Sequence, residues 1–191
     1  MMVAQMVRCV KYLIAASALH VIGDAPTYRR KRNRLDSQVY LGCAAYFVTV
    51  TVWQRRPAFT TQEIVDPCVS MLRTSADEHG MEVPAYCFMP DHVHLLLAAG
   101  EIADLPVFMR TFKQRTGYYC KKTLGWDGPF WQRSYYDHVL RREERLESVA
   151  AYTWGNPVPV GLVEDIVDYP FSGSLVAGMG AATPSSEDVE G

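Results

Sequence analysis

The sequence predicts an α+β fold of the ferredoxin-like or RRM-like sandwich type, with an antiparallel four- to five-stranded sheet and helices on one face. The order of its segments is the main observation: β-branched and aromatic runs alternate with longer runs of helical periodicity as βαββαβ, followed by one more helix. The chain has 191 residues, 49% of them hydrophobic, which is enough for one domain with a sizeable core.

Three regions are expected along the chain. Residues 1–36 form an N-terminal extension with a basic arm, residues 37–174 form the folded domain, and residues 175–191 form a disordered tail rich in small and acidic residues. The first two dozen residues loosely resemble a signal peptide, but His20 and the polar segment after it make a poor one. No stretch reaches membrane-spanning length, so no membrane partner is expected.

The first half of the domain predicts a strand, a helix and a hairpin. The apolar run at 44–53 is the clearest strand in the sequence. Thr60 and Glu63 have the spacing of a capping box, and the apolar residues after them predict a helix that ends at Gly80. A second strand over 82–88 then passes through a Pro-Asp turn into a third strand that starts at His92.

The second half adds two helices and one strand. Asp104 begins a helix with an apolar stripe, and the Gly- and Pro-containing segment at 125–129 ends it. A fourth strand is expected around 137–140, and a last helix from Glu143 through Trp154. Asn156-Pro157 ends this helix, because the residue before a proline is pushed out of the α region.

His92 and His94 are the most informative residues of the chain. Successive strand side chains alternate between faces, so both imidazoles project from the same face and make half of a metal site. The alternative is that they are two polar residues near a strand end without a function. The His-apolar-His spacing makes this the weaker explanation. A three-histidine site of the nucleotide-hydrolase kind would need a third His where Leu96 stands.

Tyr152 and Asn156 are four residues apart, so they share one face of the last helix. The Asn156 carbonyl oxygen could complete a site with two nitrogens and one oxygen, suited to Mg²⁺ or Mn²⁺, although the ligand types do not exclude zinc. A metal beside a phosphate would make attack by the Tyr152 hydroxyl feasible. From the spacing alone, a packed tyrosine and a helix-capping asparagine are the commoner explanation.

Charge and cysteine usage indicate the partner and the compartment. The formal charge is only −2, but residues 29–34 and 110–122 are basic runs that contain or adjoin aromatic residues, a pattern that suits single-stranded nucleic acid as well as a solvated surface. Five widely spaced cysteines without a Cys-x-x-Cys pair indicate free thiols in a reducing, cytoplasmic environment. The candidate DNA-binding residues are Arg30, Arg32, Arg110, Lys113, Arg115, Lys121, Lys122 and Arg133.

Six segments between residues 30 and 174 resemble the single-tyrosine His-hydrophobic-His transposases, specifically the branch associated with REP elements. They read YFVTV (46–50), CFMPDHVHLL (87–96), FKQRT (112–116), FWQRSYYDHVLR (130–141), YTWGNP (152–157) and DYPFSG (168–173). The resemblance implies that His92 and His94 bind a divalent metal, that Tyr152 is the nucleophile, and that Asn156 stands at the third ligand position, where related enzymes have Gln. Tyr135 and Tyr136 are rival nucleophiles outside the expected helix.

The same resemblance implies a metal-dependent endonuclease and strand-transferase. It would act on single-stranded or hairpin DNA through a 5′-phosphotyrosine link, in transposition or in processing of REP elements, as a monomer or homodimer associated with the nucleoid. The main alternative is a domesticated relative that binds DNA without cutting it. A metal-dependent hydrolase in which Tyr152 is only structural is a third possibility.

Overall fold

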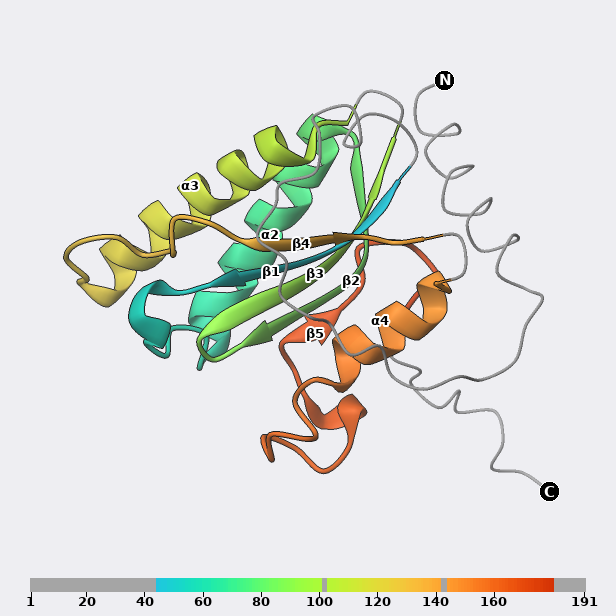
Figure 1. Cartoon of the computed structure of the whole chain (residues 1–191). Coiled ribbons are helices and arrows are strands. Elements are labelled where there is room, and N and C mark those ends of the chain that lie inside the picture. The colour runs from blue at the N-terminus through green and yellow to red at the C-terminus, as the bar shows by residue number, and fades with distance from the viewer. Residues whose placement is uncertain (1–43, 101–102, 142–143, 181–191) are drawn as a thin grey trace.

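The computed structural model of the chain describes residues 44–100, 103–141 and 144–180. In this part of the chain, five strands form one antiparallel sheet in the order β4-β1-β3-β2-β5, as Figure 1 shows. The strands are β1 (Ala45–Thr51), β2 (Met81–Met89), β3 (His92–Ala99), β4 (Tyr136–Val139) and β5 (Ser172–Gly173). The order of the first four is that of a ferredoxin-like sandwich, and the α+β prediction is confirmed.

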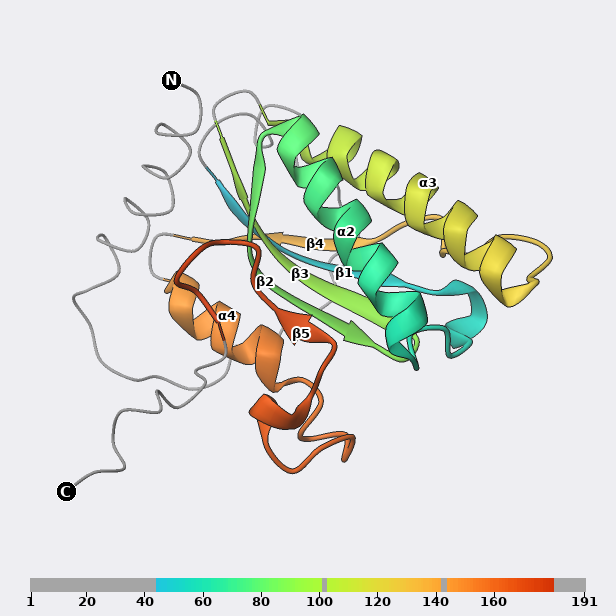
Figure 2. The same cartoon turned by 180° about the vertical axis from the view of Figure 1, so that it is seen from behind.

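The helices lie on both faces of this sheet. The first two, α2 (Gln62–His79) and α3 (Leu105–Leu124), pack on one face, whereas α4 (Leu146–Gly155) packs on the other, as Figures 1 and 2 show from opposite sides. The prediction of helices on one face is therefore wrong for α4. The reason lies in β1, which has apolar residues on both of its faces and needs two covering layers.

Two separate cores follow from this arrangement. Residues Tyr46, Val48 and Val50 of β1 belong to the core under α2 and α3. The alternating residues Ala45 and Phe47 belong to a second core, which α4 closes. The face of the sheet that α4 covers is the face that carries the candidate site.

Local sequence signals explain most of the helix ends. The Asp104 carboxylate accepts a hydrogen bond of 2.9 Å from the backbone N–H of Val107 and caps α3, as predicted. Gly80 and Gly125 close α2 and α3 in the left-handed conformation, with φ of 64° and 63°. The capping box predicted at Thr60 is wrong, because Thr61 is the N-cap residue and its side chain makes no cap hydrogen bond. The last helix also begins three residues later than expected, at Leu146.

The edge strand β5 connects α4 to the sheet. Gly173 pairs with Tyr86 of β2, and its carbonyl oxygen accepts a hydrogen bond of 2.9 Å from the Trp154 indole of α4. A Cβ atom on Gly173 would come within 2.7 Å of the Tyr86 hydroxyl oxygen, so any larger residue here would have to displace the Tyr86 ring. The helix that carries Tyr152 is thereby fixed at its C-terminal half.

Several sequence-based expectations concern residues outside the described ranges. The basic arm with Arg30 and Arg32, and the tail after residue 180, belong to this group, so the proposed region boundaries stay predictions. Among the described cysteines, Cys68, Cys87 and Cys120 are free thiols, as expected. None of the helices in the described ranges is long and apolar enough to cross a membrane.

Candidate active site

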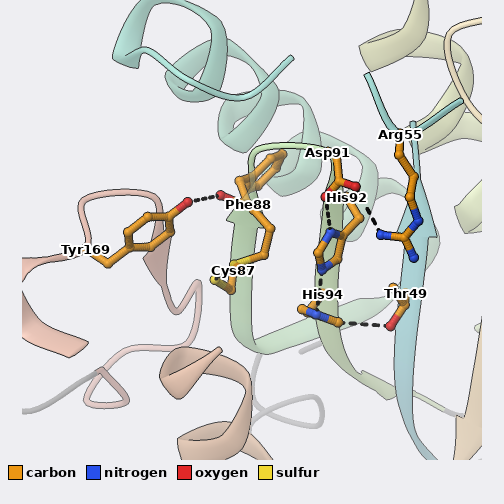
Figure 3. A network of polar contacts seen from close by, with 9 residues as sticks. Thr49, Arg55, Cys87, Phe88, Asp91, His92, His94 and Tyr169 are labelled. Atoms are coloured by element: carbon orange, nitrogen blue, oxygen red, sulfur yellow. Dashed lines mark hydrogen bonds and ion pairs between the residues drawn. The ribbon is translucent and has the colours of Figure 1, made fainter. Parts of the chain in front are cut away.

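His92 and His94 sit at the start of β3, directly after the turn that joins it to β2. Their side chains point to the α4 face of the sheet, and their Nε2 atoms are 3.0 Å apart (Figure 3). The two rings are nearly perpendicular, with centroids 4.6 Å apart. The Nε2 atoms of the two imidazoles therefore point toward each other.

The Nδ1 atom of each imidazole has its own partner. Nδ1 of His92 lies 2.5 Å from Asp91 Oδ1, and Nδ1 of His94 lies 2.9 Å from Thr49 Oγ1. The Asp91 carboxylate can only accept, so His92 carries its proton on Nδ1 and keeps a lone pair on Nε2. The Thr49 hydroxyl can donate or accept, so it can accommodate either tautomer of His94.

The two imidazoles differ in burial. His94 is only 8% exposed, and this burial, reinforced by the neighbouring His92, lowers the His94 pKa to about 3. Burial would by itself raise the pKa of Asp91, but hydrogen bonds from His92 and Arg55 and their electrostatic attraction outweigh it and hold that pKa below its usual value. Asp91 is thus a carboxylate that orients His92, and His94 is a neutral imidazole.

The histidine pair fits a divalent cation. Two nitrogens bound at about 2.1 Å to adjacent corners of an octahedron lie about 3 Å apart, which is close to the 3.0 Å found here. A carboxylate on the far nitrogen of a ligating imidazole is also the usual support of such a ligand. Within the described ranges, no three His, Cys, Asp or Glu side chains are arranged so that they could hold one metal ion together.

Tyr152 lies on the same face of the sheet as the histidines. The Phe47 ring of β1 stacks on the His94 ring with a centroid distance of 5.4 Å, and it meets the Tyr152 ring edge-on at 5.7 Å. The Tyr152 side chain is 38% exposed. A single aromatic residue thus contacts both the histidine pair and the tyrosine of α4.

Asn156 follows α4 as its C-cap residue. Its Nδ2 donates to the carbonyl oxygens of Tyr152 at 2.8 Å and Thr153 at 3.2 Å. The helix-capping explanation is therefore correct, but it does not exclude ligation. Because the amide nitrogen faces these carbonyls, the amide oxygen points elsewhere and keeps its lone pairs, so its role as a third ligand stays a prediction.

The rival tyrosines, Tyr136 at the start of β4 and Tyr135 just before it, face opposite ways. Tyr135 packs against the core under α2 and α3, whereas Tyr136 packs against the core under α4. Tyr136 pairs with Thr49, which in turn pairs with His94, so Tyr136 is two strands away from the histidine strand. Tyr135 therefore lies on the face opposite the histidines. Of these two tyrosines, only Tyr136 shares the histidine face.

Residues 42–154, well over half of the chain, match the family model described as "Transposase IS200 like". The chain belongs to the IS200-like transposase family. The matched residues include the histidine strand, the turn before it and Tyr152. The expectation of a transposase enzyme of the single-tyrosine type is confirmed at this level.

Several known proteins are similar to this transposase. A candidate REP-associated tyrosine transposase of Haemophilus influenzae is 27% identical over an alignment of 143 residues, which covers 66% of this chain and 77% of that protein. The REP-associated tyrosine transposase of Escherichia coli K12 is 25% identical over 135 residues, or 70% and 78% of the two chains. A solved structure of a REP-associated tyrosine transposase bound to a REP hairpin shares the fold, with a TM-score of 0.58, 22% identity and coverage of 78% and 82%.

The candidate DNA-binding residues of the transposase have different surroundings. Arg110, Lys122 and Arg133 are exposed and Lys121 is half-buried, with the three α3 residues on the layer that faces away from the histidines. Lys113 already donates to the carbonyl oxygens of Gln132 and Arg133, at 2.8 and 3.1 Å. The Arg115 guanidinium pairs with Glu78 of α2 at 2.9 Å, in addition to a contact with Ser75.

Four residues of the site were missed by the sequence reasoning: Thr49, Arg55, Phe47 and Asp91 in its role as partner of His92. Only Asp91 has a local signal, because it directly precedes His92. The other three come from β1 or the turn after it, and the register of β1 against β3 brings them to the histidines. The tertiary pairing of these strands assembles the surroundings of the imidazoles.

Proposed function

We propose that this transposase is a metal-dependent single-strand DNA endonuclease and strand-transferase in which Tyr152 is the nucleophile. The observation that supports this proposal is the contact of Phe47 with both His94 and Tyr152, which puts the phenol and the histidine pair on one face of one chain. A DNA hairpin with single-stranded flanks is the proposed substrate, since the protein of similar fold carries a REP hairpin.

Tyr152 would act in two reversible steps. Its hydroxyl oxygen attacks the scissile phosphorus, a bond from Tyr152 to the 5′-phosphate forms, and the bond to the 3′-oxygen breaks. The phenol proton ends on the departing 3′-oxygen, so the products are a 5′-phosphotyrosine and a free 3′-hydroxyl. Attack by another 3′-hydroxyl reverses the reaction and joins strands without an external energy source.

The histidine pair would hold the divalent ion, with Asn156 as the proposed third ligand. Mg²⁺ or Mn²⁺ bound there would supply Lewis-acid polarisation of the scissile phosphate. Asp91 keeps the His92 lone pair on Nε2, and burial keeps His94 neutral. Each imidazole can therefore offer its Nε2 atom to a cation, His94 once its proton lies on Nδ1. Phe47 contacts both the Tyr152 ring and the His94 ring.

Trapping of a covalent adduct tests this function. The wild-type protein, incubated with labelled single-stranded and hairpin DNA and Mg²⁺ or Mn²⁺, should give a complex that survives denaturation. Peptide mapping by mass spectrometry should place the nucleotide on Tyr152.

Tyr152→Phe is the decisive variant, because it removes only the hydroxyl and should keep folding, metal affinity and DNA binding while eliminating the adduct. Tyr136→Phe is the matched control on the same face of the sheet and should still form the adduct. A nucleotide on Tyr135 or Tyr136, or an adduct in Tyr152→Phe, would contradict the assignment. DNA binding with no adduct in any protein would instead support the non-catalytic DNA-binding alternative.

A further inference from the structure

Arg55 places a cation beside the histidine pair. Its Nη1 donates to Asp91 Oδ2 at 3.0 Å, while the other oxygen of the same carboxylate contacts His92. Figure 3 shows the guanidinium between Asp91 and Thr49, on the side of the sheet to which the imidazoles point. Despite this ion pair, the Arg55 side chain is 68% exposed, so much of the guanidinium surface stays accessible to a ligand.

The backbone at this point is held in an unfavourable conformation. Gln54 and Arg55, in the short 3-10 turn Trp53–Arg55, have φ of 56° and 55°, although neither is glycine. The turn is anchored at its start, since Val52 N–H donates to the Asp91 carbonyl at 2.9 Å and Trp53 N–H donates to the Phe130 carbonyl at 2.7 Å.

Core packing does not explain this strain, because both residues are exposed. Two adjacent left-handed residues with exposed side chains are the kind of strain that clusters at functional sites. Their effect here is to turn Arg55 toward Asp91. The next residue, Arg56, points elsewhere, with its guanidinium 3.8 Å from the centre of the Trp126 ring.

We propose that Arg55 is a further catalytic residue, which binds the non-bridging oxygens of the scissile phosphate while Tyr152 attacks it. This inference rests on the proposed function. A planar guanidinium has donors on more than one edge, so it can keep one hydrogen bond to Asp91 and direct others to a phosphate. Charge builds up on those phosphate oxygens during transfer, and a fixed cation stabilises it.

A merely structural role for Arg55 predicts something different. In that case Arg55 would act through Asp91 and His92, and its removal would weaken metal binding rather than the chemical step. Metal affinity must therefore be measured separately from the rate of the chemical step.

The test compares Arg55→Ala, Arg55→Lys and the matched control Arg56→Ala. Adduct formation is followed in single turnover at saturating single-stranded DNA and saturating Mn²⁺. Mn²⁺ affinity is measured without turnover, by titration calorimetry in the Tyr152→Phe background. Arg55→Ala should slow adduct formation by about 100-fold, as loss of one charge-stabilising donor does. Its Mn²⁺ affinity should stay unchanged, Arg55→Lys should recover part of the rate, and Arg56→Ala should react like the wild type.

Two results would overturn the proposal. Adduct formation by Arg55→Ala at the wild-type rate would remove Arg55 from the chemistry. A weakened Mn²⁺ affinity, with full recovery of the rate at higher Mn²⁺, would reduce Arg55 to a positioning residue for Asp91. The absence of any adduct in the wild-type protein would be a different failure, because it would refute the proposed function and not the role of Arg55 alone.

Discussion

The side chains around the histidine pair prepare it for a cation at the level of single residues. Asp91 contacts Nδ1 of His92 and Thr49 contacts Nδ1 of His94, and the two Nε2 atoms lie 3.0 Å apart. Without an ion, the two Nε2 atoms can lie this close only if one donates a hydrogen bond to the other. This requires that His94 carry its proton on Nε2 and that the Thr49 hydroxyl donate to Nδ1 of His94. Binding of a cation then requires that this proton move to Nδ1, and the rotating Thr49 hydroxyl allows it.

His92→Ala or His94→Ala should abolish cleavage, because a site with a single imidazole holds its ion poorly. We expect a loss of adduct formation of at least about 100-fold, since changes to supporting residues alone cost 10- to 100-fold. The rate should be measured over a range of chelator-buffered Mg²⁺ and Mn²⁺, with circular dichroism to verify the fold. Wild-type rates in either variant would show that the pair is not the metal site.

Helices α3 and α4 lie on opposite faces of the sheet and carry different candidate residues. The α4 face carries Tyr152 and the histidines, whereas α3 lies on the opposite face with the exposed cations Arg110 and Lys122. A shallow groove of about 840 Å³ between α2 and α3 is lined by Lys122 and by the aromatic residues Tyr118 and Tyr119, but also by the acidic Asp66. If DNA contacts α3, it must pass an edge of the sheet to reach Tyr152.

Neutralising Arg110, Lys121 and Lys122 should flatten the salt dependence of single-strand affinity. Each lost phosphate contact should reduce the slope of log affinity against log salt by about 0.7. Lys113 and Arg115 should contribute less to this slope, because their cations have partners within the protein. Fluorescence anisotropy with labelled DNA in the Tyr152→Phe background gives the slopes. An unchanged slope in the triple variant would mean that this part of α3 is only a solvated surface.

Glu82 of β2 should destabilise the folded protein at neutral pH and above. Its Oε2 atom is buried and has no hydrogen-bond partner among the described residues, and burial raises the Glu82 pKa from 4.5 to about 7. The folded state therefore holds the proton more tightly than the unfolded state, and stability declines as pH rises from 4.5 to about 7.

Glu82→Gln should raise the free energy of unfolding at pH 8 by about 1–2 kcal/mol, after allowance for partial exposure. The difference should vanish near pH 4, where both states of the wild type are protonated. Urea denaturation at the two pH values measures it. Equal stabilisation at both pH values would point to packing, and no stabilisation at pH 8 would contradict the ionisation argument.

At the scale of the whole molecule, one chain brings the histidines and Tyr152 together. Phe47 of β1 contacts His94 of β3 and Tyr152 of α4, and α4 is fixed to the sheet edge by the bond from Trp154 to Gly173. These contacts join four elements of the same chain. If Tyr152 is the nucleophile, we therefore expect a single chain to supply both it and the histidines.

A mixture of His94→Ala and Tyr152→Phe should form no adduct, because in this arrangement neither chain supplies both parts of the site. Adduct yield with labelled DNA, measured after co-expression and after mixing, is the test. Recovery of the adduct in the mixture would show that Tyr152 acts on the histidines of a partner chain, as in an exchanged homodimer.

The sequence by itself predicted four of the five strands and most helix ends, because these depend on local signals, whereas the short edge strand β5 was not predicted. Alternating histidines, a capping Asp104 and the closing glycines act over a few residues of chain. The family motifs likewise indicated Tyr152 and the histidines before any spatial arrangement was known.

Only the tertiary structure decided the side on which α4 packs and the surroundings of the histidines. The pairing of Thr49 with His94, the contact of Phe47 with Tyr152 and the approach of Arg55 to Asp91 join residues far apart in sequence. Their positions depend on strand register and on how two apolar faces of one sheet are covered. Both are set by packing of the whole chain, which no local pattern contains.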